Sequence, residues 1–153
     1  MIEVTVRQRL LPVRAAEVRA VVAAAFAGEG RPAPRLAVRV LDDAGIRALN
    51  ARWLGHDWPT DAIAFDYGED PERRGPAGEV FVSAETALRE ARARRRDPRD
   101  ELLLYVAHGA LHLLGWDDGT PARRRAMNAR AAGVVRRALQ TPGARHAVKA
   151  RRP

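Results

Sequence analysis

The segment that decides the fold of this chain spans residues 97–118 and reads DPRDELLLYVAHGALHLLGWDD. Asp97 and Pro98 are residue types that begin helices, because aspartate caps free amide groups and proline fits the first turn. From there to Gly115, a typical helix end, apolar residues dominate. A helix that is apolar on nearly all sides is buried. The segment therefore predicts a helix buried inside the domain.

The sequence on either side of this helix predicts strands and further helices. Alternating apolar residues and short apolar runs between turn signals predict strands at 2–6, 36–41, 60–65 and 78–83. Apolar residues at helical spacing, together with capping residues, predict helices at 13–28, 42–53, 84–95 and 121–139.

The order of these elements predicts the fold class. Strands and helices do not alternate regularly, so we expect one α+β domain over residues 1–140, with a mixed sheet of about four strands packed with four to five helices. The strand at 60–65 follows Pro59, and we expect it at a sheet edge, where an extended substrate can lie. Residues 141–153 are basic and poor in large apolar residues, which predicts a flexible tail.

Charge is distributed unevenly along the chain. Residues 1–118 hold 17 of the 27 Lys and Arg residues and all 19 Asp and Glu residues, which gives a net charge of −2. Residues 119–153 hold ten basic residues and no acidic one, which gives +10. A basic segment attracts phosphate, so the C-terminal end indicates a nucleic-acid partner.

Composition excludes several classes of protein. The chain has no cysteine, which excludes disulfides, thiolate zinc sites and iron–sulfur clusters. Its longest apolar run, residues 20–27, is far shorter than the roughly 20 residues that a membrane span needs. The first residues alternate like a strand and do not resemble a signal peptide. We therefore expect a cytoplasmic protein with no membrane contact.

Two histidines on the predicted buried helix are the strongest candidates for a functional site. His108 and His112 are four residues apart, which places both imidazoles on one helical face. Such a pair can bind one metal ion, or each ring can hydrogen-bond to a backbone carbonyl. After Gly115 the chain can turn back across this face and bring Asp117 and Asp118 near it. Two histidines and a carboxylate form an ordinary catalytic zinc site.

These residues limit the reaction that a bound metal could support, but they do not identify the metal. Gly109 stands where an HExxH motif would have its glutamate, which argues against a zinc peptidase mechanism. We expect one Zn²⁺ per chain, although two imidazoles and a carboxylate also suit nickel, iron or manganese.

The histidine segment also resembles a known family. Residues 108–118, HGALHLLGWDD, closely resemble the HGxLHLxGYDH signature of the YbeY family of metal-dependent endoribonucleases, which are rRNA maturation factors. Residues 57–65, DWPTDAIAF, resemble the family's TDVLSF region, and residues 78–83, GEVFVS, resemble its GDIxIS strand. The resemblance extends over residues 36–138.

The chain departs from the family pattern at informative positions. Asp118 stands where the family has its third histidine ligand, and Trp116 stands where tyrosine is usual. Leu54 stands where the family pattern has an arginine, so the role of that arginine is not carried over. Arg52 is no substitute, because two residues apart on a helix point in different directions. These substitutions resemble those of one branch of the family.

The resemblance implies an endoribonuclease that cleaves single-stranded RNA in rRNA maturation or ribosome quality control, with a metal-activated water attacking the phosphodiester. His108, His112 and Asp118 are the implied metal ligands. Asp117 is a candidate proton acceptor in catalysis, and a surface turn residue is the alternative for it. Single-stranded RNA, rRNA and the ribosome are the implied partners.

Several residues near these ligands are candidate RNA contacts. Arg123, Arg124 and Arg125 can bind phosphates, and Trp116 and His56 can contact bases near the site. Each has a structural alternative. Arginine runs such as 92–96 and 123–125 are more often solvated helix faces, tryptophan more often packs in a core, and a loop histidine is more often solvated.

Two alternatives to the ribonuclease prediction remain open. The first is a metal-containing RNA-binding factor in ribosome assembly with little catalysis of its own, which the missing arginine favours. The second is a zinc hydrolase of peptides or small molecules, which the absent HExxH glutamate and the cationic end disfavour. RNA cleavage that a chelator abolishes separates the ribonuclease from both.

Overall fold

The computed structural model describes residues 1–55 and 60–140, in which four strands and five helices follow one another along the chain. In order they are β1 (Ile2–Val6), α1 (Ala15–Gly28), β2 (Leu36–Leu41), α2 (Asp43–Leu54), β3 (Ala62–Asp66), β4 (Gly78–Ser83), α3 (Ala84–Arg94), α4 (Pro98–Leu113) and α5 (Pro121–Gln140). All nine overlap the elements expected from the sequence, although β3 and α1 each begin two residues later than expected. The predicted tail lies outside the described residues.

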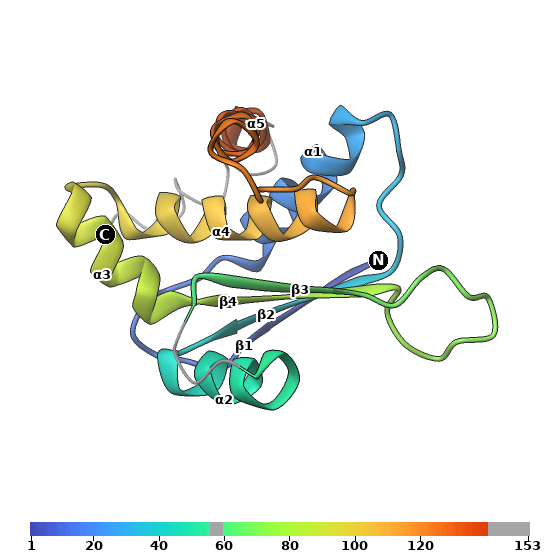
Figure 1. The fold of residues 1–153 in the computed structure, drawn as a ribbon, viewed down its shortest axis with the longest axis horizontal. Helices are drawn as coiled ribbons and strands as arrows, with labels where there is room; N and C mark the ends of the chain where they lie inside the picture. Colours follow the sequence, from blue (N-terminus) through green and yellow to red (C-terminus); the bar gives the residue numbers. More distant parts are fainter. Residues whose placement is uncertain (56–59, 141–153) are drawn as a thin grey trace, which may run out of the picture.

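The four strands form one mixed sheet in the order β1-β2-β4-β3. Strands β1, β2 and β4 are parallel, whereas β3 runs antiparallel to β4. In Figure 1, α2 lies on one face of the sheet, α1 and α4 lie on the other, and α5 packs over α1 and α4. The predicted α+β class is confirmed, and β3 occupies the predicted edge.

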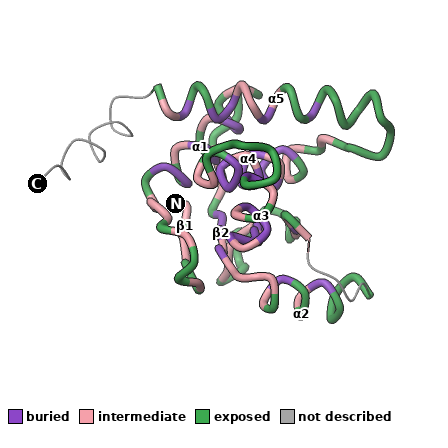
Figure 2. The backbone as a smooth tube through the Cα atoms, turned by 90° about the vertical axis from the view of Figure 1, so that its left-hand side faces the viewer, coloured by how far each residue is buried: buried purple, intermediate pink, exposed green. Residues whose placement is uncertain are grey.

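Helix α4 is the buried helix that the sequence predicts. It contacts the sheet, α1, α3 and α5, and Figure 2 shows it enclosed by these elements. The carboxylate of Asp97 caps it by accepting the Arg99 amide at 2.8 Å. Gly115 ends its last turn at a φ of 95°, which is costly for any residue with a Cβ. Among the described helices, none is long and apolar enough to cross a membrane.

One glycine lets α4 lie close to the sheet. A Cβ built on Gly109 would lie 2.3 Å from Cγ1 of Val80 and 3.0 Å from its Cγ2. Both residues are fully enclosed by the main core, so the helix cannot move outward without losing packing. Gly109 therefore sets the distance between α4 and β4. The turns of α4 that carry His108 and His112 are held at that distance from the sheet.

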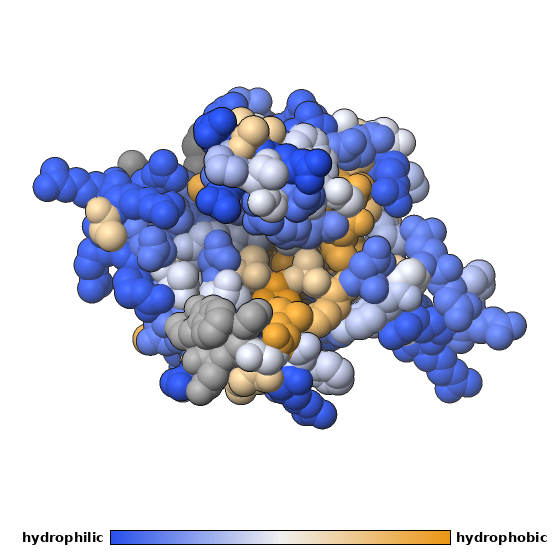
Figure 3. All heavy atoms as spheres, in the orientation of Figure 1, coloured by the Kyte–Doolittle hydropathy of each residue, from blue (hydrophilic) through white to orange (hydrophobic). Residues whose placement is uncertain are grey.

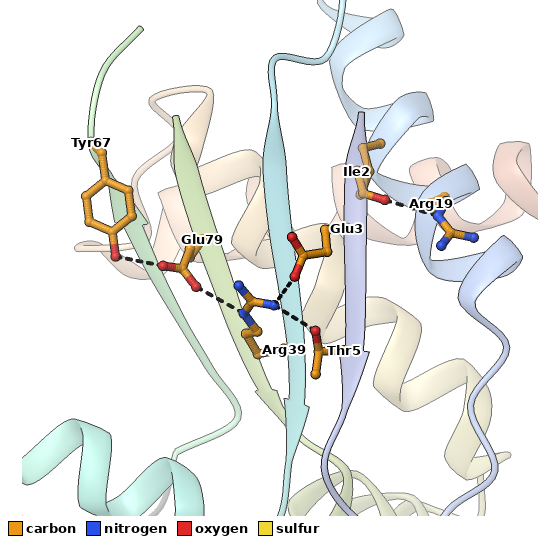
Figure 4. Close-up of polar contacts among 7 residues, drawn as sticks. All are labelled: Ile2, Glu3, Thr5, Arg19, Arg39, Tyr67 and Glu79. Carbon is orange, nitrogen blue, oxygen red and sulfur yellow. Dashed lines mark hydrogen bonds and ion pairs between the residues drawn. The ribbon is translucent and has the colours of Figure 1, made fainter. Parts of the chain in front are cut away.

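The sheet face opposite α4 carries a polar network centred on Arg39. Its guanidinium donates to Glu3 at 2.6 Å, to Thr5 at 2.7 Å and to Glu79 at 3.2 Å. The Tyr67 hydroxyl donates to the other oxygen of Glu79 at 3.2 Å (Figure 4). Arg39 thus links β1, β2 and β4, and this part of the sheet face is polar.

Asp43, the first residue of α2, joins that helix to α3. Its carboxylate accepts hydrogen bonds from Ser83 at 2.7 Å, Thr86 at 2.6 Å and Arg89 at 2.7 Å. Burial raises the pKa of this carboxyl group, but the three donors outweigh burial and hold the pKa below its usual value. The folded state therefore favours the ionised carboxylate.

Asp43→Asn should lower stability in a pH-dependent way. A carboxyl pKa that folding lowers contributes stability above the unfolded pKa of about 4, and that contribution is lost as the pH falls through the folded value. We expect a loss of about 1–3 kcal/mol at pH 7 that shrinks below about pH 4. Urea unfolding at pH 7, 5 and 3 measures it. Glu69→Gln, in the exposed loop after β3, is the control, and a loss independent of pH would contradict the prediction.

Candidate active site

A cleft of about 790 Å³ lies between α4, α5 and the start of β3. Figure 3 shows apolar surface in the hollow between α5 and β3, below a mostly hydrophilic α5. The residues that line it are Thr60, Asp61, Ala62, Arg94, Arg96, Glu101, Leu104, Tyr105, His108, His112, Asp118, Arg124, Asn128, Ala129 and Ala132. All three metal ligands expected from the sequence are among them.

His112 is held in a defined orientation by the turn that follows α4. Its Nδ1 lies 3.1 Å from the carbonyl oxygen of Trp116, and a carbonyl only accepts, so Nδ1 carries the proton. The lone pair is then on Nε2, which lies 3.8 Å from Oδ2 of Asp118. Gly115 makes this turn possible by its positive φ. The chain therefore turns back and brings Asp118 to His112, as the sequence suggested.

His108 lies one turn earlier and faces α5. Its Nε2 is 2.8 Å from Oδ1 of Asn128, which accepts the ring proton in this arrangement. Its Nδ1 is buried and has no hydrogen-bond partner in the structure. A buried ring nitrogen without a partner costs free energy, so His108 is not satisfied as an ordinary core histidine is.

The donor chemistry of this corner fits a divalent cation. His112 presents a lone pair toward a carboxylate, and its other nitrogen is fixed by a backbone carbonyl, as is usual for metal-binding histidines. Across the described ranges, however, no three His, Asp or Glu side chains are grouped closely enough to hold an ion. Binding by all three expected ligands would therefore require their side chains to move closer together.

Asp117 forms its hydrogen bonds with groups other than the histidines. Its carboxylate accepts the Gly119 amide at 2.8 Å and pairs with Arg123 at 2.6 Å. The Gly119 hydrogen bond and, next, the bond from Arg123 lower the pKa of Asp117, which makes it a weaker base. These contacts favour the turn role that the sequence left open for Asp117. Its part in catalysis stays a prediction.

Only one of the described candidate RNA contacts lines the cleft. Arg124 lines the cleft, whereas Arg123 pairs with Asp117 and Arg125 is exposed outside the lining. Trp116 packs against the core; its indole N–H donates to Glu29 at 3.0 Å, and Arg130 lies 5.8 Å from its ring. His56 lies outside the described residues.

The position where the family pattern has an arginine does not reach this cleft. Leu54 is exposed at the end of α2, and it is not among the lining residues. Arg52 lies with its guanidinium 5.1 Å from the ring of Trp53, away from the cleft lining. Arg52 therefore does not replace the missing arginine, as expected.

Three groups of cleft residues were not found from the sequence. Asn128 and Ala132 share one face of α5 with the predicted Arg124, at a spacing of four, which is a signal that the sequence does carry. Asp61 enters from the start of β3. Arg94, Arg96 and Glu101 come from the corner between α3 and α4, where the arginines were interpreted as a solvated helix face.

Tyr105 completes the wall beside Glu101. Burial, followed by the charge of Glu101, raises the pKa of its hydroxyl well above the usual value. The hydroxyl therefore stays protonated and donates to Glu101 at 3.1 Å.

The fold and this cleft define an α+β protein in which a histidine and a carboxylate lie close together in a cleft beside an edge strand. The family model described as Endoribonuclease YbeY matches residues 5–138. The chain belongs to this family, which confirms the resemblance seen in the sequence.

Individual relatives agree with this assignment. Proteins named Endoribonuclease YbeY from Anaeromyxobacter sp. (strain Fw109-5) and Rhodopirellula baltica are 42% and 45% identical over 127 and 106 residues. These alignments cover 79% and 68% of this chain, but only 66% and 54% of the relatives' own lengths.

A solved structure supports the fold. The solution structure of TM1509 from Thermotoga maritima matches with a TM-score of 0.64 and covers 100% of this chain and 97% of its own. At 19% identity this likeness bears on the fold alone.

Proposed function

We propose that this chain is a metal-dependent endoribonuclease that cleaves single-stranded RNA during maturation of ribosomal RNA. The observation that carries the proposal is that the Asp118 carboxylate lies 3.8 Å from His112 Nε2 inside the cleft. The printed name of the relatives, endoribonuclease, supports RNA as the substrate. The ribosomal role rests on the resemblance of the histidine motif to the family's signature.

The histidines, Asp118 and the Trp116 carbonyl each have a part in this proposal. His108, His112 and Asp118 would hold a divalent cation, with zinc as the first candidate. When bound, the cation supplies a water nucleophile of lowered pKa and neutralises charge on the phosphate. The Trp116 carbonyl keeps the Nδ1 proton of His112 in place, so that Nε2 faces the ligand set.

The shape of the cleft supports an extended polyanion as substrate. Its floor includes Thr60, Asp61 and Ala62 at the start of the edge strand β3, whose outer backbone groups have no strand partner in the described sheet. Arg124 stands on the opposite wall and can donate two parallel hydrogen bonds to a phosphate.

Metal removal tests the proposal. We expect purified protein to contain about one divalent ion per chain, and Asp118→Ala to lose most of it, because two histidines alone bind weakly. Elemental analysis measures the ion. RNA cleavage should stop in EDTA and return when Zn²⁺ or Mn²⁺ is added. Stoichiometric metal retained in Asp118→Ala would refute the assignment of the third ligand.

A second function, an RNA-binding assembly factor without catalysis, is favoured by one observation. In this structure His108 contacts Asn128, and the described residues do not group three ligands around a common point. RNA binding by a metal-loaded sample that never cleaves single-stranded RNA would support this second function.

A further inference from the structure

Two arginines from the corner between α3 and α4 stand at one end of the cleft. Arg94 and Arg96 line the same cavity as the histidines, although they lie outside the histidine motif and outside the basic C-terminal segment. Their side chains are 56% and 55% exposed, so the guanidinium groups are open to a ligand.

A buried carboxylate lies near both arginines. The Glu101 side chain is 3% exposed, and its oxygens lie 3.5 Å from Nη1 of Arg94 and 3.9 Å from Nη1 of Arg96. Tyr105 donates to the same carboxylate from the wall of the cleft. A buried charge requires compensation, so Glu101 attracts both guanidinium groups to this end of the cleft, although its Oε2 has no hydrogen-bond partner in the structure.

Most of the hydrogen-bonding capacity of the two arginines is unused by these contacts. Each guanidinium has five N–H donors. Arg94 directs donors to Glu101 and, at 3.4 Å, to Glu90, and Arg96 approaches Glu101 through one nitrogen. The remaining donors can bind a phosphate in the paired geometry that arginine favours.

The position of this arginine pair relates it to the metal ligands. Glu101 precedes His108 by seven residues on α4, which corresponds to about 10 Å along the helix axis. Arg124 lies on the α5 wall of the same cavity. Phosphates bound at the arginine pair would therefore belong to nucleotides other than the one beside the histidines.

We propose that Arg94 and Arg96, held by Glu101, form a second phosphate-binding site that anchors the RNA strand beyond the cleavage position. The inference rests on the proposed function, because it takes RNA as the ligand. It assigns a binding role to an arginine run whose sequence alone suggests only a solvated surface.

Binding of a cleavage-resistant RNA tests the inference. The probe is a fluorescent 12-nucleotide oligouridine with 2′-O-methyl and phosphorothioate groups, and anisotropy reports its Kd at several salt concentrations. We expect R94Q/R96Q to weaken binding about tenfold or more near 0.1 M salt. The slope of log K against log salt should fall by about 1.4, because each phosphate contact on a single strand contributes about 0.7.

A matched control comes from the same arginine run. R92Q/R95Q removes the same charge from residues that do not line the cleft, and its Kd should stay within twofold of wild type. Equal weakening by both double variants would overturn the site, since charge alone would then explain binding. Wild-type affinity in R94Q/R96Q would also overturn it.

A third variant separates phosphate binding from structural support of Glu101. R94Q/R96Q/E101Q removes the buried acid together with its cations, so thermal stability should be closer to wild type than in R94Q/R96Q. RNA binding should remain weak. Recovery of RNA binding in the triple variant would show that the arginines only neutralise Glu101. Failure of the proposed function gives a different result from failure of this inference. If the proposed function is wrong, the wild-type protein binds RNA but does not cleave it. If the arginine pair is not a binding site, R94Q/R96Q binds RNA with the wild-type Kd.

Discussion

Gly109→Ala should lower the free energy of unfolding by about 2 kcal/mol, and the melting temperature by about 4–8 °C. The added methyl group would lie 2.3 Å from Val80 in a core where neither α4 nor β4 can move freely. Overpacking of this kind costs up to about 3 kcal/mol, and the helix propensity of alanine returns about 1 kcal/mol. Thermal or urea unfolding measures the loss.

Two further variants isolate the cause of this loss. Gly133→Ala adds the same methyl group to the interior of α5, where its nearest atom is Arg136 Nη2 at 3.9 Å, and it should be neutral or stabilising. In Gly109→Ala/Val80→Ala the smaller side chain at position 80 makes room for the added methyl group. The stability loss of the double variant should therefore be smaller than the sum of the two single losses, by about 0.5–3 kcal/mol. A double-variant loss equal to that sum would contradict the close contact.

His112→Ala should reduce RNA cleavage by about a thousandfold or more, because it removes the ligand whose lone pair faces Asp118. RNA affinity should change much less, because the arginines of the cleft remain. Single-turnover cleavage of a labelled RNA measures the rate, and anisotropy measures the affinity. The fold should be retained, since the His112 side chain is 37% exposed.

The control for this variant is Arg136→Gln, on an exposed part of α5 outside the cleft lining, which should cleave at a rate near that of wild type. Cleavage by His112→Ala at a similar rate would sink the assignment of His112 as a metal ligand. Because both proteins are purified in the same way, a contaminating nuclease would appear in both.

The sequence predicted most of the fold because its elements are defined by local signals. The apolar composition of residues 101–114, with Asp97 and Gly115 at its two ends, indicated the buried helix α4. The alternation of apolar residues indicated four strands, and Pro59 indicated that β3 is an edge. The parallel order β1-β2-β4 depends on contacts between distant segments, which local patterns do not encode.

The candidate site was predictable where helical geometry alone positions its residues. His108 and His112 share a face because of their spacing of four, and Gly115 allows the return to Asp118. Helical spacing alone could not separate the adjacent carboxylates Asp117 and Asp118, because their directions depend on the turn, and only the family resemblance indicated Asp118 as the ligand. In the structure Asp118 approaches His112, whereas Asp117 pairs with Arg123.

The sequence by itself therefore determined the family, the central helix and the histidine pair, all of which depend on short segments. Only the tertiary structure brought Asn128 from α5 to His108, and Arg94 and Arg96 from the end of α3 into the same cleft. The physical reason is that these residues meet through packing of helices far apart in the chain and through one buried charge, Glu101, that two arginines compensate.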